Sequence, residues 1–190
     1  MKLGILVPYR DRADQLKKFI PGLSDYLVSY DIEFEITIIH QLGQGPFNRG
    51  KLLNVGYLNS PNPDYFIFHD VDIFPIRGTK DTEPDHFGYH GMPNYFPTDH
   101  ARSIAKPAQK VAGCIVAVSN HALRDVNGHS NSYWGWGYED MDFYYRLRHA
   151  EIRIDEQGKR SSKPYGRKWF KWLDKGSGWV DGYERNQQLF

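Results

Sequence analysis

Apolar positions in the first part of the chain follow two kinds of pattern. Between Leu16 and Tyr30 they recur every three or four residues, which predicts an amphipathic helix that Pro21-Gly22 kinks or interrupts. A second helix is predicted over 47–58. Strands are predicted over residues 3–7, a continuous apolar run typical of a buried strand, over the β-rich run 34–39 and over the aromatic run 65–69. The order β-α-β-α-β predicts an α/β sheet with right-handed crossovers.

The second part of the chain is less regular. Residues 76–109 are rich in Gly, Pro and His and predict binding loops with one short strand. A further strand is predicted over 111–119, followed by a polar loop rich in Gly and Trp at 127–138. A helix is predicted to begin near Glu139. Lysine and arginine cluster between residues 159 and 175, so the chain carries a basic tail.

Composition excludes several classes of protein. The chain has 190 residues and one cysteine, Cys114, which excludes an internal disulfide framework and a zinc site built on several cysteines. The net charge of +1 gives no general attraction to nucleic acid, so no such partner is expected. No apolar run reaches the roughly 20 residues that span a bilayer. We therefore expect no transmembrane segment and a location in the cytoplasm.

Charged residues follow two of the predicted strands. Arg10 and Arg12 follow the first strand, and Asp70 and Asp72 follow the third. Because ligands of such sheets bind at the carboxyl ends of the strands, both pairs should open on the same edge. The two carboxylates can share Mg²⁺ or Mn²⁺ bridging a diphosphate, and the arginines can grip a phosphate. The alternatives are a solvated acidic turn and surface arginines paired with neighbouring aspartates.

Two predicted helix starts also carry candidate chemistry. Residues 47–51, Phe-Asn-Arg-Gly-Lys, favour an anion because backbone N–H groups are free at a helix start. In residues 133–142, glycines alternate with bulky aromatics and three carboxylates follow. This pattern predicts a mobile hinge with flat apolar surfaces and a base that accepts a proton from a hydroxyl. The alternative is an ordinary acidic helix start with Trp134 and Trp136 in the core.

Four motifs resemble, in order, the β-1,4-galactosyltransferase family. They are Val7-Pro8-Tyr9-Arg10-Asp11-Arg12, residues 47–56, Asp70-Val71-Asp72, and Trp134-Gly135-Trp136-Gly137-Tyr138-Glu139-Asp140. The resemblance implies the GT-A fold of inverting nucleotide-sugar transferases: α/β, with a mostly parallel central sheet flanked by helices. It implies one catalytic domain over 1–190, with a Rossmann-like nucleotide-binding half at 1–75. The acceptor and catalytic half, with its loops and basic tail, would occupy 76–190.

The resemblance also implies roles for individual residues. Asp140 would be the catalytic base, and Glu139 would bind sugar hydroxyls beside it. Asp72 would ligate Mn²⁺. The residues implied to bind the UDP-sugar donor or the saccharide acceptor are Pro8, Arg10, Arg12, Phe47, Arg49, Asp70, Val71, Trp136, Gly137 and Asp142.

The function implied is inverting transfer of galactose or N-acetylgalactosamine from a UDP-sugar to a saccharide hydroxyl, forming a β-linkage. One alternative is a catalytically silent glycan- or nucleotide-binding module of the same fold. Another is a metal-dependent phosphohydrolase. The joint presence of Asp72, Glu139 and Asp140 favours the enzyme over the silent module.

The chain departs from the family pattern at several positions. Tyr138 stands where the best-known members have glycine, and no histidine follows His149, although the family normally supplies a second metal ligand there. Val111 falls near a tyrosine of galactose-specific members, so we expect N-acetylgalactosamine donors to be accepted comparably with galactose donors. The chain begins at its first strand, whereas animal members carry a membrane anchor. This difference favours a cytoplasmic enzyme.

Overall fold

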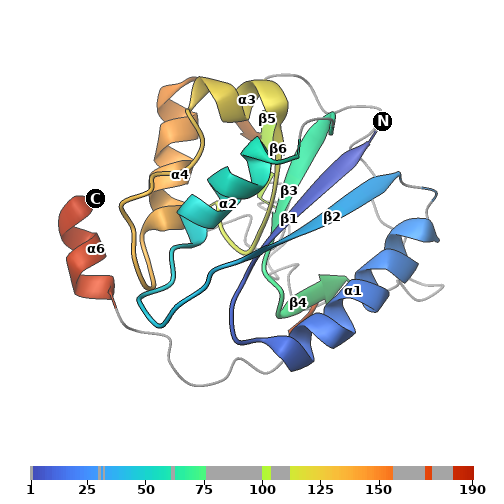
Figure 1. The fold of residues 1–190 in the computed structure, drawn as a ribbon. Coiled ribbons are helices and arrows are strands. Elements are labelled where there is room, and N and C mark those ends of the chain that lie inside the picture. The colour runs from blue at the N-terminus through green and yellow to red at the C-terminus, as the bar shows by residue number, and fades with distance from the viewer. Residues whose placement is uncertain are drawn as a thin grey trace.

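A computed structural model describes residues 2–29, 31, 33–60, 63–75, 100–103, 112–155, 170–172 and 182–190. Its main sheet has six strands in the order β2-β1-β3-β6-β5-β7 (Figure 1). Their bounds are β1 Leu3–Tyr9, β2 Phe34–His40, β3 Tyr65–His69, β5 His100–Ser103, β6 Ile115–Ser119 and β7 Arg153–Asp155. Among these strands only β6 runs against its neighbours, since β1 pairs in parallel with β2 and β3, and β5 with β7. The predicted α/β fold with a mostly parallel sheet is confirmed.

Helices cover both faces of this sheet. These helices are α1 Ala13–Val28, α2 Arg49–Leu58, α3 Asn120–Asp125 and α4 Glu139–His149, whereas α6 Tyr183–Leu189 lies apart from the strands in Figure 1. In Figure 1, α1 lies to one side of the strands and α2, α3 and α4 lie to the other. A separate two-stranded antiparallel sheet pairs β4 (Ile73–Pro75) with β8 (Phe170–Trp172).

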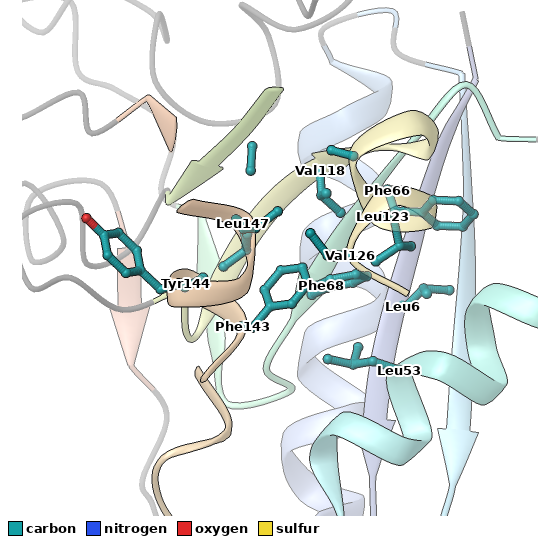
Figure 2. Packing of buried hydrophobic residues seen from close by; sticks show 14 of the residues in the cluster. Leu6, Leu53, Phe66, Phe68, Val118, Leu123, Val126, Phe143, Tyr144 and Leu147 are labelled. Carbon is teal, nitrogen blue, oxygen red and sulfur yellow. The ribbon is translucent and has the colours of Figure 1, made fainter. Parts of the chain in front are cut away.

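Alternation along the strands separates two cores. Successive side chains of a strand point to opposite faces. Ile5 and Val7 of β1 therefore pack with Phe19 and Leu23 of α1, whereas Leu6 packs with the α2 residue Leu53 on the other face. The second core also contains apolar residues of β3, β6, α3 and α4 (Figure 2). Burial on both faces explains why β1, β3 and β6 are runs of mostly apolar residues.

Two local predictions were wrong, the first only in part: the interruption of the first helix is contradicted, whereas a kink at Pro21 stays a prediction. The first helix is not interrupted: α1 continues through Pro21, which is exposed, while Phe19 before it and Leu23 after it are buried against the sheet. Packing of that face outweighs the hydrogen bond that proline removes. The strand predicted over 111–119 begins only at Ile115, because Cys114 has a left-handed backbone with φ of 60°.

The helix predicted near Glu139 is confirmed, and β5 is the short strand expected within 76–109. Val111 and most of the basic tail lie outside the described residues. The division of the chain at residue 75 stays a prediction. In the described part of the chain, no helix is both long and apolar enough to cross a membrane.

Candidate active site

Arg49 and Asp70 form the charged centre of the site. Arg49 is the first residue of α2, and Asp70 directly follows β3. The Nε of Arg49 donates to Oδ1 of Asp70 at 2.9 Å, and the arginine side chain is only 11% exposed. Burial by itself would lower the pKa of the guanidinium, but the charges of Asp70 and Glu139 more than compensate and raise it. The cation is therefore retained in a buried position.

Two donors of this cation are available for a ligand. Nη1 and Nη2 of Arg49 are buried and have no hydrogen-bond partner among the described residues. Leaving buried, charged donors unsatisfied is costly, so such atoms indicate a missing acceptor. A guanidinium edge with two parallel donors suits the oxygens of a phosphate.

The loop before α2 lies against Arg10. Nη1 of Arg10 donates to the carbonyl of Gly45 at 2.6 Å, and its guanidinium lies over the Phe47 ring, 5.5 Å from the centroid. Arg12, by contrast, is the half-buried residue before α1, and the described contacts do not connect it to Arg49. Arg10 and Arg12 therefore have different surroundings: Arg10 contacts the 43–47 loop, whereas Arg12 directly precedes α1.

Pro8 and Val71 are apolar residues expected in the donor site, and the structure buries both. Pro8 is buried within β1, where it is paired with Ile39 of β2. The side chain of Val71 is 6% exposed and packs in the core formed with α1. A ligand could therefore meet Val71 through its backbone only.

Two asparagines, one at the start of α2 and one within it, hold the loop that leads to α4. Asn48 caps α2 by accepting from the N–H of Lys51, and its Nδ2 donates to the carbonyl of Asn131 at 2.8 Å. Asn54 accepts from the N–H of His129 and donates to its carbonyl, at 2.9 and 2.8 Å. This loop is thereby tied to the helix that carries Arg49.

His129 is buried within this loop but does not serve as a charged group. Its ring stacks on Phe143 with centroids 4.0 Å apart, and burial lowers its pKa well below the usual range. Neither ring nitrogen has a hydrogen-bond partner among the described residues. His129 is therefore a neutral part of the core.

Glu139 and Asp140 begin α4, and Asp140 lies against the segment 112–114. The N–H of Ala112 donates to the carbonyl of Asp140 at 3.0 Å, and the carbonyl of Cys114 accepts from the N–H of Asp70 at 3.1 Å. This short segment thus connects the end of β3 to the start of α4. A Cβ on Gly113 would lie 2.5 Å from Oδ2 of Asp140, so only glycine leaves room for that carboxylate.

Glu139 has the most perturbed carboxyl described in the site. Burial, with a further contribution from the charge of Asp140, raises its pKa to about 7, although Arg49 acts in the opposite direction. Its Oε2 is buried without a hydrogen-bond partner among the described residues. Because the charges of Arg49 and Glu139 each shift the pKa of the other, the buried guanidinium and the carboxylates at the start of α4 lie in one site.

Asp142 lies in the first turn of α4 and interacts with Arg146 and Tyr133. Burial raises its pKa, while Arg146 and the hydroxyl of Tyr133 act in the opposite direction. Its Oδ2 lies 3.8 Å from Nη1 of Arg146. These contacts make Asp142 less available than Asp140 for contact with a substrate.

Asp72 follows β3 in a turn and is half-buried. Its carboxylate oxygens are hard ligands of the kind that Mn²⁺ prefers. The described residues contain no group of three His, Cys, Asp or Glu side chains that could hold a metal ion. Asp72 thus fits as one ligand, and the described part of the chain does not complete a cage.

The aromatic loop ends at the site with an unusual backbone. Tyr138, directly before α4, has a left-handed conformation with φ of 70°, and Gly137 has φ of 99°. Glycine adopts such values without strain, which explains why glycine suits position 138. Trp136 is 45% exposed, and Lys51 lies over the Trp134 ring at 5.7 Å from the centroid. The alternative that both tryptophans fill the core is therefore wrong for Trp136.

Sequence reasoning missed residues that shape the site without carrying charge. They are Asn48, Asn54, Gly113 and Asn186. The N-cap preference of asparagine could have identified Asn48. The other three act through contacts between distant segments, for which the sequence carries no local signal.

Comparisons with known proteins agree with this geometry. Residues 1–81 match the model described as the N-terminal region of glycosyl transferase group 7, and residues 100–166 match the N-terminal domain of galactosyltransferase. The chain is 35% identical over 156 residues to human β-1,4-galactosyltransferase 7, covering 80% of this chain and 46% of the relative. It is 33% identical over 158 residues to the xylosylprotein 4-β-galactosyltransferase of Caenorhabditis elegans, covering 80% and 52%. The chain belongs to the β-1,4-galactosyltransferase family.

Solved structures resemble the fold closely. A Drosophila β-1,4-galactosyltransferase 7 mutant in complex with manganese, UDP-Gal and xylobiose superposes with a TM-score of 0.77 at 25% identity, covering 98% of this chain and 79% of that one. The catalytic domain of the same enzyme with xylobiose gives 0.77 at 26% identity and the same coverage. The expected GT-A-type fold is thereby confirmed. This chain spans about half the length of the curated relatives that it matches.

Proposed function

We propose that this chain is an inverting galactosyltransferase that transfers galactose from UDP-galactose to a hydroxyl of a saccharide acceptor. The observation that carries the proposal is the single electrostatic site formed by Arg49, Asp70 and the carboxylates at the start of α4. It combines a buried cation with free donors and carboxylates that can take up a proton. A transferase that separates a diphosphate from a sugar needs both functions.

Arg49 would bind the diphosphate through Nη1 and Nη2, the two donors without partners among the described residues. Arg10 and Phe47 would complete the wall on the nucleotide side, where the cation already lies over the ring. Asp140 would take the proton of the acceptor hydroxyl as that oxygen attacks C1 of the sugar from the face opposite the diphosphate. Attack from that face inverts the anomeric centre and yields a β-linkage from an α-linked donor.

Glu139 would hold sugar hydroxyls beside the base through its buried Oε2. Trp136 and Gly137 would cover the donor and exclude water, which limits wasteful hydrolysis. Mn²⁺ is the cofactor that we propose, and when bound it neutralises charge on the diphosphate leaving group. Asp72 is the described residue that would hold the ion, together with diphosphate oxygens.

This ligand set predicts that Mn²⁺ binds weakly without UDP and more firmly with it. Titration calorimetry with and without UDP measures the difference, which we expect to be at least about tenfold in Kd. Tight binding to the UDP-free protein would show that a second protein ligand exists.

The test of the proposed function is a transfer assay with UDP-galactose, Mn²⁺ and two acceptors, xylobiose and N-acetylglucosamine. We expect UDP release that depends on an acceptor, with a galactosylated product of β configuration. UDP binding without transfer to either acceptor would instead support a silent binding module. UDP release that is independent of any acceptor would support the phosphohydrolase.

Two finer points stay predictions. Acceptance of N-acetylgalactosamine rests on Val111, and competition between the two donors in one assay would test it; a strong preference for galactose would contradict it. Location in the cytoplasm would be tested by fractionation of cells that express the full-length protein.

A further inference from the structure

Helix α6 packs against the loop that carries Trp136. We call residues 134–138 the Trp loop. Figure 1 shows α6 in red on the same side of the molecule as α4, which the Trp loop precedes. The helix lies beyond both segments that match the family models, which end at residue 166. Its contacts with the Trp loop join residues about fifty positions apart in the sequence.

One part of this contact holds the backbone of the Trp loop. Asn186 is fully buried, and its Nδ2 donates to the carbonyls of Gly137 at 3.0 Å and of Trp136 at 3.3 Å. The guanidinium of Arg185 donates to the carbonyl of Trp134. If the Trp loop moved away, a buried amide would lose both acceptors, which is unfavourable. The loop backbone is therefore tied to α6 along its length.

A second set of contacts with α6 holds the side chains of Trp136 and Tyr138. The ring of Tyr183 stacks on the indole of Trp136, with centroids 5.5 Å apart and planes at 25°. The hydroxyl of Tyr138 donates to that of Tyr183 at 3.2 Å, and Phe190 packs on the Tyr138 ring at 5.5 Å. Trp136 and Tyr183 are 45% and 42% exposed. The indole is therefore not buried in the main core, and α6 packs against one of its faces.

The contacts of α6 also help to stabilise the left-handed backbone of Tyr138. Such a conformation costs a non-glycine residue roughly 1 kcal/mol or more. The contacts of the Tyr138 ring with Tyr183 and Phe190 offset that cost. The path of the Trp loop into α4 thus depends on α6.

We propose that α6 is a clamp that sets the position of the Trp loop, with Asn186 and Tyr183 as positioning residues. This inference rests on the proposed function, in which Trp136 covers the sugar beside Asp140. The clamp acts on the acceptor and sugar side of the site. Arg49, which would bind the diphosphate, is held by its ion pair with Asp70 and has no described contact with α6, so we expect the clamp to affect binding of the diphosphate much less.

The direct test is hydrogen exchange of the whole chain, followed by mass spectrometry of peptides that contain the Trp loop. The Gly135 N–H donates to the carbonyl of Phe47 at 2.7 Å and is a protected probe within the loop. We expect Asn186→Ala and Tyr183→Ala each to accelerate exchange there about tenfold. Gln187→Ala, which removes an exposed amide from the same helix, should change it less than twofold.

Tyr183→Phe separates stacking from a general effect of mutating the helix, because it keeps the ring on Trp136 and removes only the hydroxyl. We expect exchange within about threefold of wild type for this variant. If Asn186→Ala does not fold, the pair Tyr183→Ala and Tyr183→Phe decides the matter, since Tyr183 is exposed. Unchanged exchange in the Trp loop of both alanine variants would overturn the clamp, as would equal acceleration by Gln187→Ala.

The kinetic test compares the KM for the acceptor with the Kd for UDP. Asn186→Ala should raise the acceptor KM about tenfold and leave the UDP Kd within about twofold, a split that general destabilisation would not produce. Equal losses on both sides would overturn the clamp. If wild type neither binds UDP nor transfers galactose, the proposed function fails, and hydrogen exchange alone still decides whether α6 holds the loop.

Discussion

The proposed donor side of the site, with Arg49 and Asp70, and its proposed catalytic side, with Glu139 and Asp140, are held in place by different contacts. On the donor side, Arg49 and Asp70 lie on consecutive elements of the β-α-β unit and hold each other by a partly buried ion pair. On the catalytic side, Glu139 and Asp140 follow a glycine-rich loop whose backbone is held by Asn186 of α6. Charge fixes the first side, and hydrogen bonds to backbone fix the second.

This difference separates binding from catalysis. A change on the donor side should act mainly on affinity for UDP, because Arg49 supplies positive charge beside Asp70 at the end of β3. A change on the catalytic side should act mainly on turnover, because the position of Asp140 depends on the backbone around it. The variants below are ordered from the largest expected effect to the smallest.

Asp140→Asn removes the proposed base and keeps the shape of the side chain. Because an amide cannot take up the proton, we expect transfer to fall about 10² to 10⁴-fold, while UDP affinity stays within about twofold. Assays of transfer and calorimetry with UDP measure the two effects. Asp125→Asn, at an exposed carboxylate of α3, is the control. Turnover near wild type in a folded Asp140→Asn protein would remove Asp140 from the role of base.

Gly113→Ala should displace the same carboxylate without touching its chemistry. The new Cβ would lie 2.5 Å from Oδ2 of Asp140, so the side chain must move. A shift of about 1 Å in a catalytic group can cost about 100-fold in rate, and we expect a loss of that order in kcat. Gly45→Ala is a matched control, since a Cβ there meets nothing within 4 Å. Equal activity of the two variants would show that Gly113 does not position Asp140.

Arg49→Lys tests the donor side, because it keeps the charge and removes the planar pair of donors. We expect the Kd for UDP to rise about 30-fold, equivalent to about 2 kcal/mol, with a smaller change in kcat at saturating donor. Calorimetry with UDP measures this, and Arg124→Lys, at an exposed position of α3, is the control. If Arg49→Lys lowered kcat by a larger factor than it raised the Kd for UDP, the expected separation of UDP binding from turnover would be wrong.

Glu139→Gln should stabilise the fold at high pH. The pKa of Glu139 is raised to about 7, so folding favours its protonated form. Its contribution to stability is therefore fully present below the ordinary value of 4.5 and is lost as pH rises through 7. Glutamine is neutral at every pH and avoids that loss. We expect the Tm of Glu139→Gln to exceed that of wild type by about 2 to 4 °C at pH 8 and to match it at pH 4.5. A difference that does not grow with pH would contradict the raised pKa.

The sequence was sufficient to predict the elements that carry the donor side. Strands β1 and β3 are buried on both faces, so each is a run of apolar and aromatic residues, whereas β2 is only partly buried and was predicted from its β-rich sequence. Helical spacing identified α1. The carboxyl ends of parallel strands share one edge, which placed Arg10 and Asp70 together. The spacing of Trp, Gly and carboxylates also located the start of α4 at Glu139.

The sequence was insufficient where distant residues decide the local conformation. Pro21 does not interrupt α1, because burial of residues on both sides outweighs one lost hydrogen bond. The side chain of Val71 belongs to the core, although its motif suggested a ligand contact. The close approach of Gly113 to Asp140 and the clamp of α6 on the Trp loop join segments far apart in the chain. The spacing of apolar residues shows only which face of a helix or strand is buried. Which side chains of other elements contact that face depends on how the elements pack, so only the tertiary structure decides it.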